Sequence, residues 1–289
     1  MNHSELIKQL TPLHGASEAR AIVRMVMEER FGLSQTDLLL GKDTTLSSSD
    51  LAEFEKIASR LLAGEPVQHI LGYADFCGHR FRVTPDVLIP RPETEQLVAY
   101  AAPILKSLNP QILKSLHILD LCTGSGCIAI SLALTFPEAR VTAIDISEAA
   151  LAIAYDNAST LGAKNITFIQ QDILDSSFGE KLEGSFTLLT ANPPYVCTSE
   201  ASTMSSTVLD HEPHQALFVP DNDPLLFYRA IARIGLNALT PGGHLIIELN
   251  SALADDTRRL FLEAGYADVR ILDDQFAHPR MLCAHRDVL

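Results

Sequence analysis

The sequence predicts an α/β protein in which a small helical bundle precedes a doubly wound, mostly parallel β-sheet with an antiparallel edge. Three observations predict this fold. The first 72 residues or so contain only helical patterns. From about residue 117 onward, apolar runs of strand length alternate with helical patterns, which is typical of parallel strands joined by right-handed crossovers. The last two strand candidates are separated by a short loop, so we expect them to pair antiparallel at an edge of the sheet.

Size and charge exclude several kinds of protein. The 289 residues suffice for about two domains, and 47% of them are hydrophobic, so a large core can form. The net charge of −14 provides no positive field for a nucleic-acid backbone. No apolar run is long enough to span a membrane, and the polar N-terminus is unlike a signal peptide. We therefore expect a cytoplasmic protein that binds neither nucleic acid directly nor a membrane.

The cysteine and histidine patterns predict neither disulfides nor a metal site. The five cysteines are an odd number and include no Cys-x-x-Cys pair. The ten histidines include no His-Glu-x-x-His motif, and His211 and His214 flank Glu212-Pro213 in what resembles a turn. This usage agrees with a reducing, cytoplasmic compartment.

Helical signals fill the N-terminal part of the chain. Apolar residues recur at helical spacing, and serines precede several of these runs as candidate N-caps. Helical segments are expected from about Ser17 to Phe31, from Ser34, over Ser49–Ala63 and over Val67–Leu71.

The pattern then changes to strands. Two short alternating runs, Tyr73–Phe76 and His79–Val83, flank Cys77-Gly78 and suggest a β-hairpin. The strands of the main sheet are expected at His117–Cys122, Arg140–Ile146, Ile166–Asp172, Phe186–Ala191, His244–Leu249, Asp268–Asp273 and Met281–Arg286. Helices are expected between them at Cys127–Phe136, from Ser147 to Gly162, and at Pro224–Leu239.

A glycine-containing loop directly follows the first strand of the main sheet. This strand runs into Thr123-Gly124-Ser125-Gly126, and open α/β sheets bind ligands at the carboxyl ends of their strands. Glycine there allows a sharp turn and a close approach of backbone N–H groups to a ligand. The next strand ends in Asp145, at the spacing expected for a carboxylate that binds ribose hydroxyls. Together these features predict a cofactor that contains a nucleoside.

The loop leaves two kinds of cofactor open. Gly124, Gly126 and Ala129 also satisfy the dinucleotide fingerprint. The charge of Asp120 would lie near a pyrophosphate, whereas it would suit the ammonium and sulfonium groups of S-adenosylmethionine. The residues therefore favour S-adenosylmethionine over a dinucleotide.

The motif Asn192-Pro193-Pro194-Tyr195 follows the fourth strand candidate and indicates the reaction. Two consecutive prolines restrict the backbone and present carbonyl groups in a fixed geometry. The Asn192 side-chain oxygen and the Pro193 carbonyl could then accept both hydrogens of a planar –NH₂ group, and Tyr195 would pack against its flat face. This arrangement would aim the nitrogen at an electrophilic methyl group and favour positive charge on it in the transition state. A simple turn after a strand explains the motif less well.

These motifs resemble those of a known family. The segments Asp120 to Gly126 and Asn192 to Tyr195, together with Asp145, resemble motifs of class I S-adenosylmethionine-dependent methyltransferases that act on planar amino groups. Enzymes of this class have a Rossmann-like sheet. More specifically, the chain resembles the PrmC/HemK family, which methylates the N5 amide of a glutamine in peptide chain release factors. The resemblance covers nearly the whole chain, and the following segments carry it: Pro66 to Gly72, Val87-Leu-Ile-Pro-Arg-Pro-Glu-Thr-Glu95, Asn192 to Tyr195, and Glu212-Pro213 followed by Ala216-Leu217.

The resemblance implies three parts of the chain and a role for each site residue. Residues 1–72 would form a helical release-factor-binding domain, residues 73–90 a β-hairpin linker, and residues 91–289 the methyltransferase domain. The roles implied for single residues are the following: Cys122, Thr123, Gly124, Ser125 and Gly126 around the methionine part of the cofactor; Asp145 on the ribose; Asp172 and Ile173 beside the adenine; and Asn192, Pro193, Pro194 and Tyr195 as the catalytic residues that hold the substrate amide, with Asn192 near the cofactor's methyl group. Arg91 and Glu93 would lie close to the cleft in a supporting role.

The chain departs from the family pattern at four places. Cys122 replaces the first glycine of the loop, and Asn250 replaces another glycine. Val219–Leu225 and Phe276–Arg280 replace segments that usually contain glycine. These changes concern cofactor affinity and loop geometry, and they leave Asn192 to Tyr195 intact.

Three functions follow from the sequence. The first is transfer of a methyl group from S-adenosylmethionine to the glutamine of the Gly-Gly-Gln motif in class 1 release factors, by an enzyme expected to be a monomer. The second is methylation of an amino group of adenine or guanine in DNA or RNA, for which a chain of net charge −14 is poorly suited. The third is a dinucleotide-binding oxidoreductase or a non-catalytic binding module, which would leave Asn192 to Tyr195 unexplained.

Overall fold

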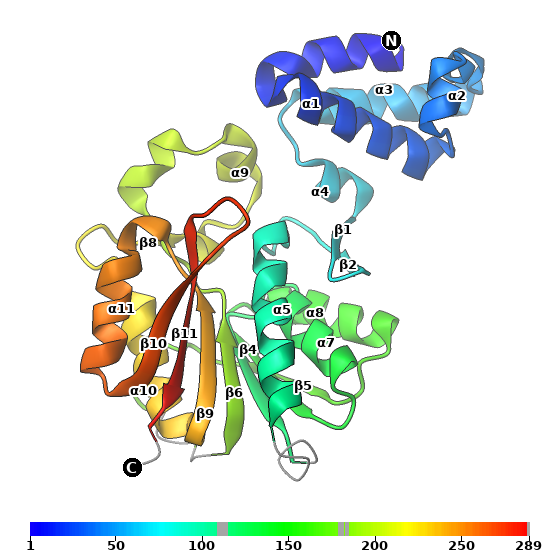
Figure 1. Ribbon diagram of the computed structural model, residues 1–289. Helices are drawn as coiled ribbons and strands as arrows, with labels where there is room; N and C mark the ends of the chain where they lie inside the picture. Colours follow the sequence, from blue (N-terminus) through cyan, green and yellow to red (C-terminus); the bar gives the residue numbers. More distant parts are fainter. Residues whose placement is uncertain (109–114, 179–181, 183–184, 288–289) are drawn as a thin grey trace. The chain divides into compact units, whose positions relative to one another are not determined.

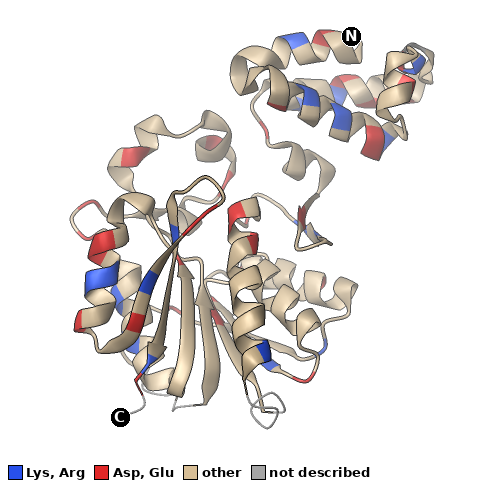
Figure 2. Cartoon of the chain, in the orientation of Figure 1, with Lys and Arg blue, Asp and Glu red and all other residues tan. Residues whose placement is uncertain are grey.

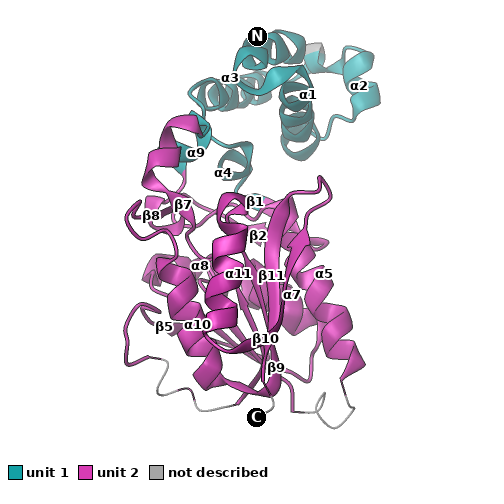
Figure 3. Cartoon of the chain, turned by 60° about the vertical axis from the view of Figure 1, so that its left-hand side comes forward, with its two compact units in different colours: residues 1–73, 204–211 teal, residues 74–203, 212–289 magenta. Residues whose placement is uncertain are grey.

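The computed structural model describes residues 1–108, 115–178, 182 and 185–287. Within them the chain divides into two compact units (Figure 3). The first contains residues 1–73 and 204–211, and the second contains residues 74–203 and 212–289. The division of the chain into a binding domain, a linker and a catalytic domain stays a prediction.

The first unit is helical. Its helices are α1 (His3–Phe31), α2 (Gln35–Leu39), α3 (Ser48–Leu62), α4 (Val67–Leu71) and α9 (Ser206–His211), with a 3₁₀ turn at Lys42–Thr45. A helical segment was expected from about Ser17 to Phe31. Gly15, with φ of 78°, kinks α1 just before Ser17, so the part of α1 after the kink matches this expected segment. The part before the kink was not expected; it begins at His3, where Asn2 and Glu5 form a capping box. The core of this unit is formed by α1 and α3 with α4, and includes Leu6, Leu10, Val23, Met27, Phe54, Ile57, Leu61 and Ile70.

The second unit contains a seven-stranded sheet with the order β10-β11-β9-β6-β3-β4-β5 (Figure 1). The strands are β3 (His117–Leu121), β4 (Arg140–Asp145), β5 (Ile166–Gln170), β6 (Phe186–Ala191), β9 (Leu239–Glu248), β10 (Tyr266–Asp273) and β11 (Pro279–Arg286). The five strands from β9 to β5 run parallel, and β11 pairs antiparallel with both β9 and β10. The predicted mostly parallel sheet with an antiparallel edge is therefore confirmed. Two small sheets accompany it: β1 (Tyr73–Phe76) with β2 (His79–Arg82), and β7 (Val196–Cys197) with β8 (Phe218–Val219).

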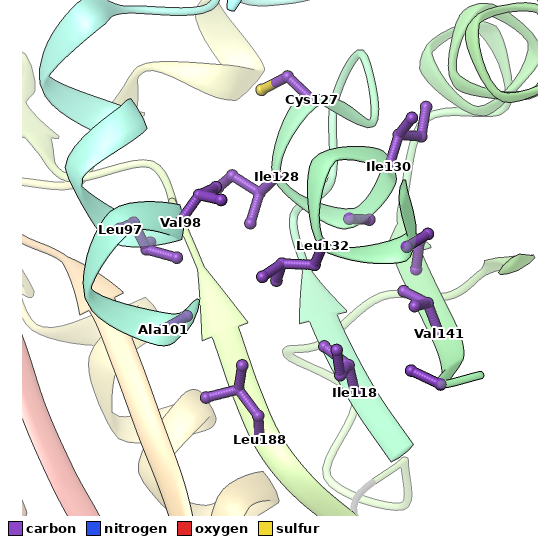
Figure 4. Packing of buried hydrophobic residues seen from close by; sticks show 14 of the residues in the cluster. Leu97, Val98, Ala101, Ile118, Cys127, Ile128, Ile130, Leu132, Val141 and Leu188 are labelled. Atoms are coloured by element: carbon purple, nitrogen blue, oxygen red, sulfur yellow. The ribbon is translucent and has the colours of Figure 1, made fainter. Parts of the chain in front are cut away.

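Helices pack on both faces of this sheet, as a doubly wound fold requires. One face is covered by α5 (Pro92–Ser107), α7 (Cys127–Thr135) and α8 (Glu148–Leu161), the other by α10 (Leu226–Ala238) and α11 (Ala254–Glu263). Successive strand residues point to opposite faces, so Ile118 packs under α7 while Leu119 lies in the cluster on the other side. Figure 4 shows Leu97 and Val98 of α5 and Ile128 and Leu132 of α7 above Ile118 and Leu188.

Charged side chains lie mainly outside this layered core. In Figure 2, β6 and β9 are almost entirely free of the colours that mark charged residues, whereas the outer helices α5 and α11 carry both signs. The whole of β6 and the Leu245–Glu248 part of β9 are buried, which explains their apolar runs, whereas the edge strand β5 is largely exposed. In the described part of the chain, no helix has the length and apolar character needed to cross a membrane.

Candidate active site

A cleft in the second unit lies where the parallel strands end. The loops after β3, β4, β5 and β6 contribute most of the residues that the sequence singled out. The predicted site residues that line it are Cys122, Thr123, Gly124, Ser125, Asp145, Asp172, Ile173, Asn192 and Pro194. Three others, Gly126, Pro193 and Tyr195, do not line it. The lining also includes residues to which the sequence assigned no role, such as Asp86, Val87, Thr94, Ile146, Leu174, Gln215 and Phe227.

The loop after β3 turns through three residues with positive φ: Cys122 at 57°, Gly124 at 53° and Gly126 at 80°. Cys122 therefore occupies a conformation that favours glycine, at a cost of about 1–2 kcal/mol for an L-residue. Burial also raises the pKa of the Cys122 thiol well above its usual value, so it stays a neutral thiol rather than a reactive thiolate. A Cβ on Gly126 would come within 2.8 Å of Ile130 Cδ1, so this glycine allows close packing beneath the loop.

Asp145 holds the glycine loop and the start of the next helix. Its Oδ2 accepts a hydrogen bond from the backbone N–H of Gly124 at 2.8 Å, and its Oδ1 accepts one from Ser147 at 2.9 Å. Burial raises the pKa of Asp145, while these backbone donors oppose the rise. Each carboxylate oxygen keeps a second lone pair, so the side chain can also accept from a ligand in the cleft.

Asp120 differs from what the sequence suggested. We expected its charge to face the ligand, but the side chain is fully buried under the loop and does not line the cleft. Its Oδ1 accepts a hydrogen bond from Thr190 Oγ1 at 2.6 Å. Burial raises the pKa of Asp120 to about 7, so the carboxyl group is partly protonated near neutral pH. The charge of Asp120 is therefore no guide to the cofactor.

Asp120→Asn is expected to stabilise the protein increasingly as the pH rises from 5 to 8. The folded-state pKa of about 7 lies above the ordinary 3.8, so folding favours the protonated form, and the wild type loses stability as the pH rises from 3.8 to about 7. Asparagine cannot ionise, and its Oδ1 can still accept from Thr190. We expect a difference in unfolding free energy on the order of a few kcal/mol at pH 8 and about half as much at pH 5, measured by urea unfolding. An equal difference at both pH values would contradict the assigned burial effect.

Asn192 and Tyr195 are both connected to the carboxyl group of Glu248. Asn192 Nδ2 donates to Thr94 Oγ1 at 3.4 Å, and Thr94 Oγ1 donates to Glu248 Oε2 at 2.6 Å. The Tyr195 hydroxyl donates to Glu248 Oε1 at 2.9 Å. Burial raises the pKa of Tyr195 well above its usual value, so the hydroxyl remains neutral. Asn250 Nδ2 donates to the Tyr195 carbonyl at 3.1 Å and so holds the backbone of the motif.

The structure also locates Arg91 and Glu93, which were expected near the cleft, and Asn250, which was expected to replace a glycine. Arg91 lines the cleft and forms an ion pair with Glu212, whose side chain is only 1% exposed. Glu93 lies in the first turn of α5 and does not line the cleft. Asn250 has a φ of −71° and caps a short 3₁₀ turn through Ala252, so its position does not demand a glycine.

The sequence did not single out Thr94, Glu212 or Glu248 as site residues with roles. Glu248 gave the clearest missed signal, since it is a charged residue directly after the buried apolar residues Leu245 to Ile247 of β9. A buried carboxylate of this kind requires partners, and both of them come from distant parts of the chain.

Comparisons with known proteins show which proteins this chain is similar to. A family model described as a methyltransferase domain matches residues 112–272, and one described as a PrmC N-terminal domain matches residues 5–72. The release factor glutamine methyltransferase of Bacteroides thetaiotaomicron is 44% identical, with 96% of this chain and 97% of that protein covered. The one of Flavobacterium psychrophilum is 39% identical, with 96% of each chain covered. A methyltransferase structure from Pyrococcus furiosus has a similar fold, with a TM-score of 0.50, 17% identity, and 79% of this chain and 97% of that chain covered.

The fold, the cleft at the strand ends and the methyltransferase-domain match together define an S-adenosylmethionine-dependent methyltransferase. This decides between the two cofactors that the glycine loop left open. The extent of the similarity further shows that the chain belongs to the release factor glutamine methyltransferase family.

Proposed function

We propose that this enzyme transfers a methyl group from S-adenosylmethionine to the side-chain amide nitrogen, N5, of the glutamine in the Gly-Gly-Gln motif of class 1 peptide chain release factors. The observation that carries the proposal is the position of Asn192 in the wall of the same cleft as the glycine loop. An amide acceptor beside the cofactor site suits a planar –NH₂ substrate. The family to which the chain belongs supports the same substrate.

The cleft fits S-adenosylmethionine by the chemistry of its walls. Asp145 offers carboxylate oxygens to ribose hydroxyls, and Ile173 and Phe227 provide apolar surface for an adenine. At Gly124 no atom lies within 4 Å of where a Cβ would be, which leaves open space beside the loop. When bound, the cofactor supplies an electrophilic methyl group on a sulfonium. We assign Cys122 to Ser125 to its methionine part and Asp172 to its adenine, with Gly126 supporting the loop from beneath.

We assign the substrate amide to Asn192 and Pro193, whose side-chain and main-chain oxygens would accept its two hydrogens. An amide nitrogen is a weak nucleophile because its lone pair is delocalised into the carbonyl group. Two acceptors placed in its plane favour the form in which positive charge builds on the nitrogen, and they hold it in line with the methyl group. Pro194 and Tyr195 would flank the flat face of the amide.

Incubation with S-adenosylmethionine and a purified class 1 release factor, followed by peptide mass spectrometry, tests the proposal. We expect one methyl group on the glutamine of Gly-Gly-Gln, and none on a release factor in which this glutamine is replaced by alanine. Unmodified release factor, together with methylated adenine or guanine in parallel reactions with DNA and RNA, would refute the proposed substrate in favour of the nucleic-acid alternative.

We further propose that residues 1–72 contribute to binding the release factor, that residues 73–90 link them to the catalytic part, and that the enzyme works as a cytoplasmic monomer. The match of residues 5–72 to the PrmC N-terminal domain supports the first assignment. Sedimentation of the enzyme with and without a release factor measures the stoichiometry.

A further inference from the structure

Thr94 is hydrogen-bonded to both Asn192 and Glu248, and neither Thr94 nor Glu248 has a part in the function proposed above. We propose that they are positioning residues that fix the orientation of the Asn192 amide, so that its oxygen, and not its nitrogen, is presented to the substrate. The inference rests on the proposed function, because it concerns how the same site supplies an acceptor to a substrate amide.

The register of two parallel strands brings these residues together. In the pairing of β6 with β9, Ala191 lies opposite Ile247. The next residues along the two strands, Asn192 and Glu248, therefore lie at the same edge of the sheet. Helix α5 packs against β9 and supplies Thr94 from its first turn.

The hydrogen bonds among the three side chains run in one direction. An ionised carboxylate can only accept, so Thr94 Oγ1 uses its single hydrogen to donate to Glu248 Oε2. The Thr94 oxygen can then only accept from Asn192, and it does so from Nδ2 at 3.4 Å. This contact turns Asn192 Oδ1 away from Thr94, and within the described residues Oδ1 accepts no hydrogen bond. The wall of the cleft thus retains a free acceptor, as a substrate –NH₂ group requires.

The same carboxyl group also fixes the other end of the motif. Glu248 Oε1 accepts from the Tyr195 hydroxyl at 2.9 Å, while Oε2 accepts from Thr94. One rigid group at the end of β9 therefore determines the positions of both Asn192 and Tyr195. Preorganisation of this kind removes the need to orient the amide acceptor during the reaction.

The environment of Glu248 makes this orientation sensitive to pH. Its side chain is buried, and burial raises the pKa of Glu248; the hydrogen bonds from Thr94 and Tyr195 and the positive charge of Arg280 oppose the rise, and the negative charge of Glu93 adds to it. A protonated carboxyl group must donate at one of the two contacts where the carboxylate accepts. Protonation would therefore reverse one hydrogen bond and disturb the motif as the pH falls through this raised pKa.

Steady-state kinetics of four variants with release factor as substrate test the proposal. Glu248→Gln keeps the size of the side chain but must donate at one contact, and Thr94→Val keeps the volume but removes the hydroxyl. For both we expect kcat to fall about 10-fold to 100-fold, the range typical of residues that orient a functional side chain. The dissociation constant for S-adenosylmethionine, measured calorimetrically, and the KM for release factor should change little. Thr94→Ser, which keeps the hydroxyl, should restore most of kcat.

The matched control is Thr257→Val. Thr257 is a fully buried threonine in α11 that donates to the Leu253 carbonyl, outside the cleft, so its loss of a hydroxyl should lower stability without changing kcat. The pH profile gives a readout that a purely structural role would not affect. Wild-type kcat should fall on the acid side with a pKa above that of an ordinary glutamate, and this acid limb should be absent in Glu248→Gln.

Unchanged kcat in Thr94→Val and Glu248→Gln would overturn the proposal. A fall in kcat that is proportional to weaker S-adenosylmethionine binding or to lower unfolding free energy would also overturn it. So would an acid limb of the pH profile that persists in Glu248→Gln. A wild-type enzyme that fails to methylate release factor would instead refute the proposed function, so the two failures can be distinguished in the same assay.

Discussion

Replacing Asn192 by alanine is expected to lower kcat for release factor methylation by about 10²-fold to 10³-fold, the loss typical when one preorganised hydrogen-bonding group is removed from a developing charge. The variant would keep the Pro193 carbonyl but lose the second acceptor for the substrate –NH₂ group. Its unfolding free energy should change little, because the described contacts of the side chain amount to one long hydrogen bond to Thr94. Single-turnover assays with saturating S-adenosylmethionine measure the chemical step directly.

Two further variants make this result interpretable. Asn192→Asp keeps one acceptor oxygen but turns the donor toward Thr94 into a second acceptor, so we expect an activity between those of the wild type and the alanine variant. Asn222 lies exposed in a turn and does not line the cleft, so Asn222→Ala is a matched control that should retain full activity. A kcat for Asn192→Ala within a few-fold of wild type would show that the acceptor role is wrong.

The sheet could be predicted because its central strands are buried on both faces. Leu188 and Leu189 pack into different clusters on the two sides of β6, so the whole strand is apolar and stands out in the sequence. Helix α11 was not predicted, because few of its residues are buried and apolar. Its buried stripe consists only of Ala254, Thr257 and Phe261, and the remaining residues are largely charged.

In the site, too, some features could be predicted from local sequence patterns and others could not. Cys122, Gly124, Asp145 and Asn192 could be placed because residues at the ends of parallel strands meet at one edge of the sheet. The partnership of Glu248 with Thr94 depends on strand register and on helix packing across 154 positions of sequence, which no local pattern encodes. The orientation of Asn192 depends on that partnership and could be derived only from the structure.

Replacing Arg91 by methionine is expected to lower the unfolding free energy by about 3 kcal/mol, at the lower end of the 3–5 kcal/mol typical of a broken buried ion pair because Arg91 is 34% exposed. Glu212 would remain buried and charged, with its Oε2 still accepting from the Ile89 N–H at 3.1 Å. Adding Glu212→Gln should recover much of this loss, because a neutral carboxamide is less costly to bury and can still accept from Ile89.

The control for this effect is Arg82→Met, because Arg82 and Asp156 form an ion pair at 2.6 Å with both side chains more than half exposed. Water already solvates these two charges, so breaking the pair should cost less than about 1 kcal/mol. Urea unfolding followed by circular dichroism compares the variants. If Arg91→Met and Arg82→Met lost equal stability, or if the double variant of Arg91 and Glu212 were less stable than Arg91→Met, burial of the Glu212 charge could not be the cause. The larger loss at Arg91 follows from desolvation alone, since the two pairs have nearly equal lengths of 2.5 and 2.6 Å.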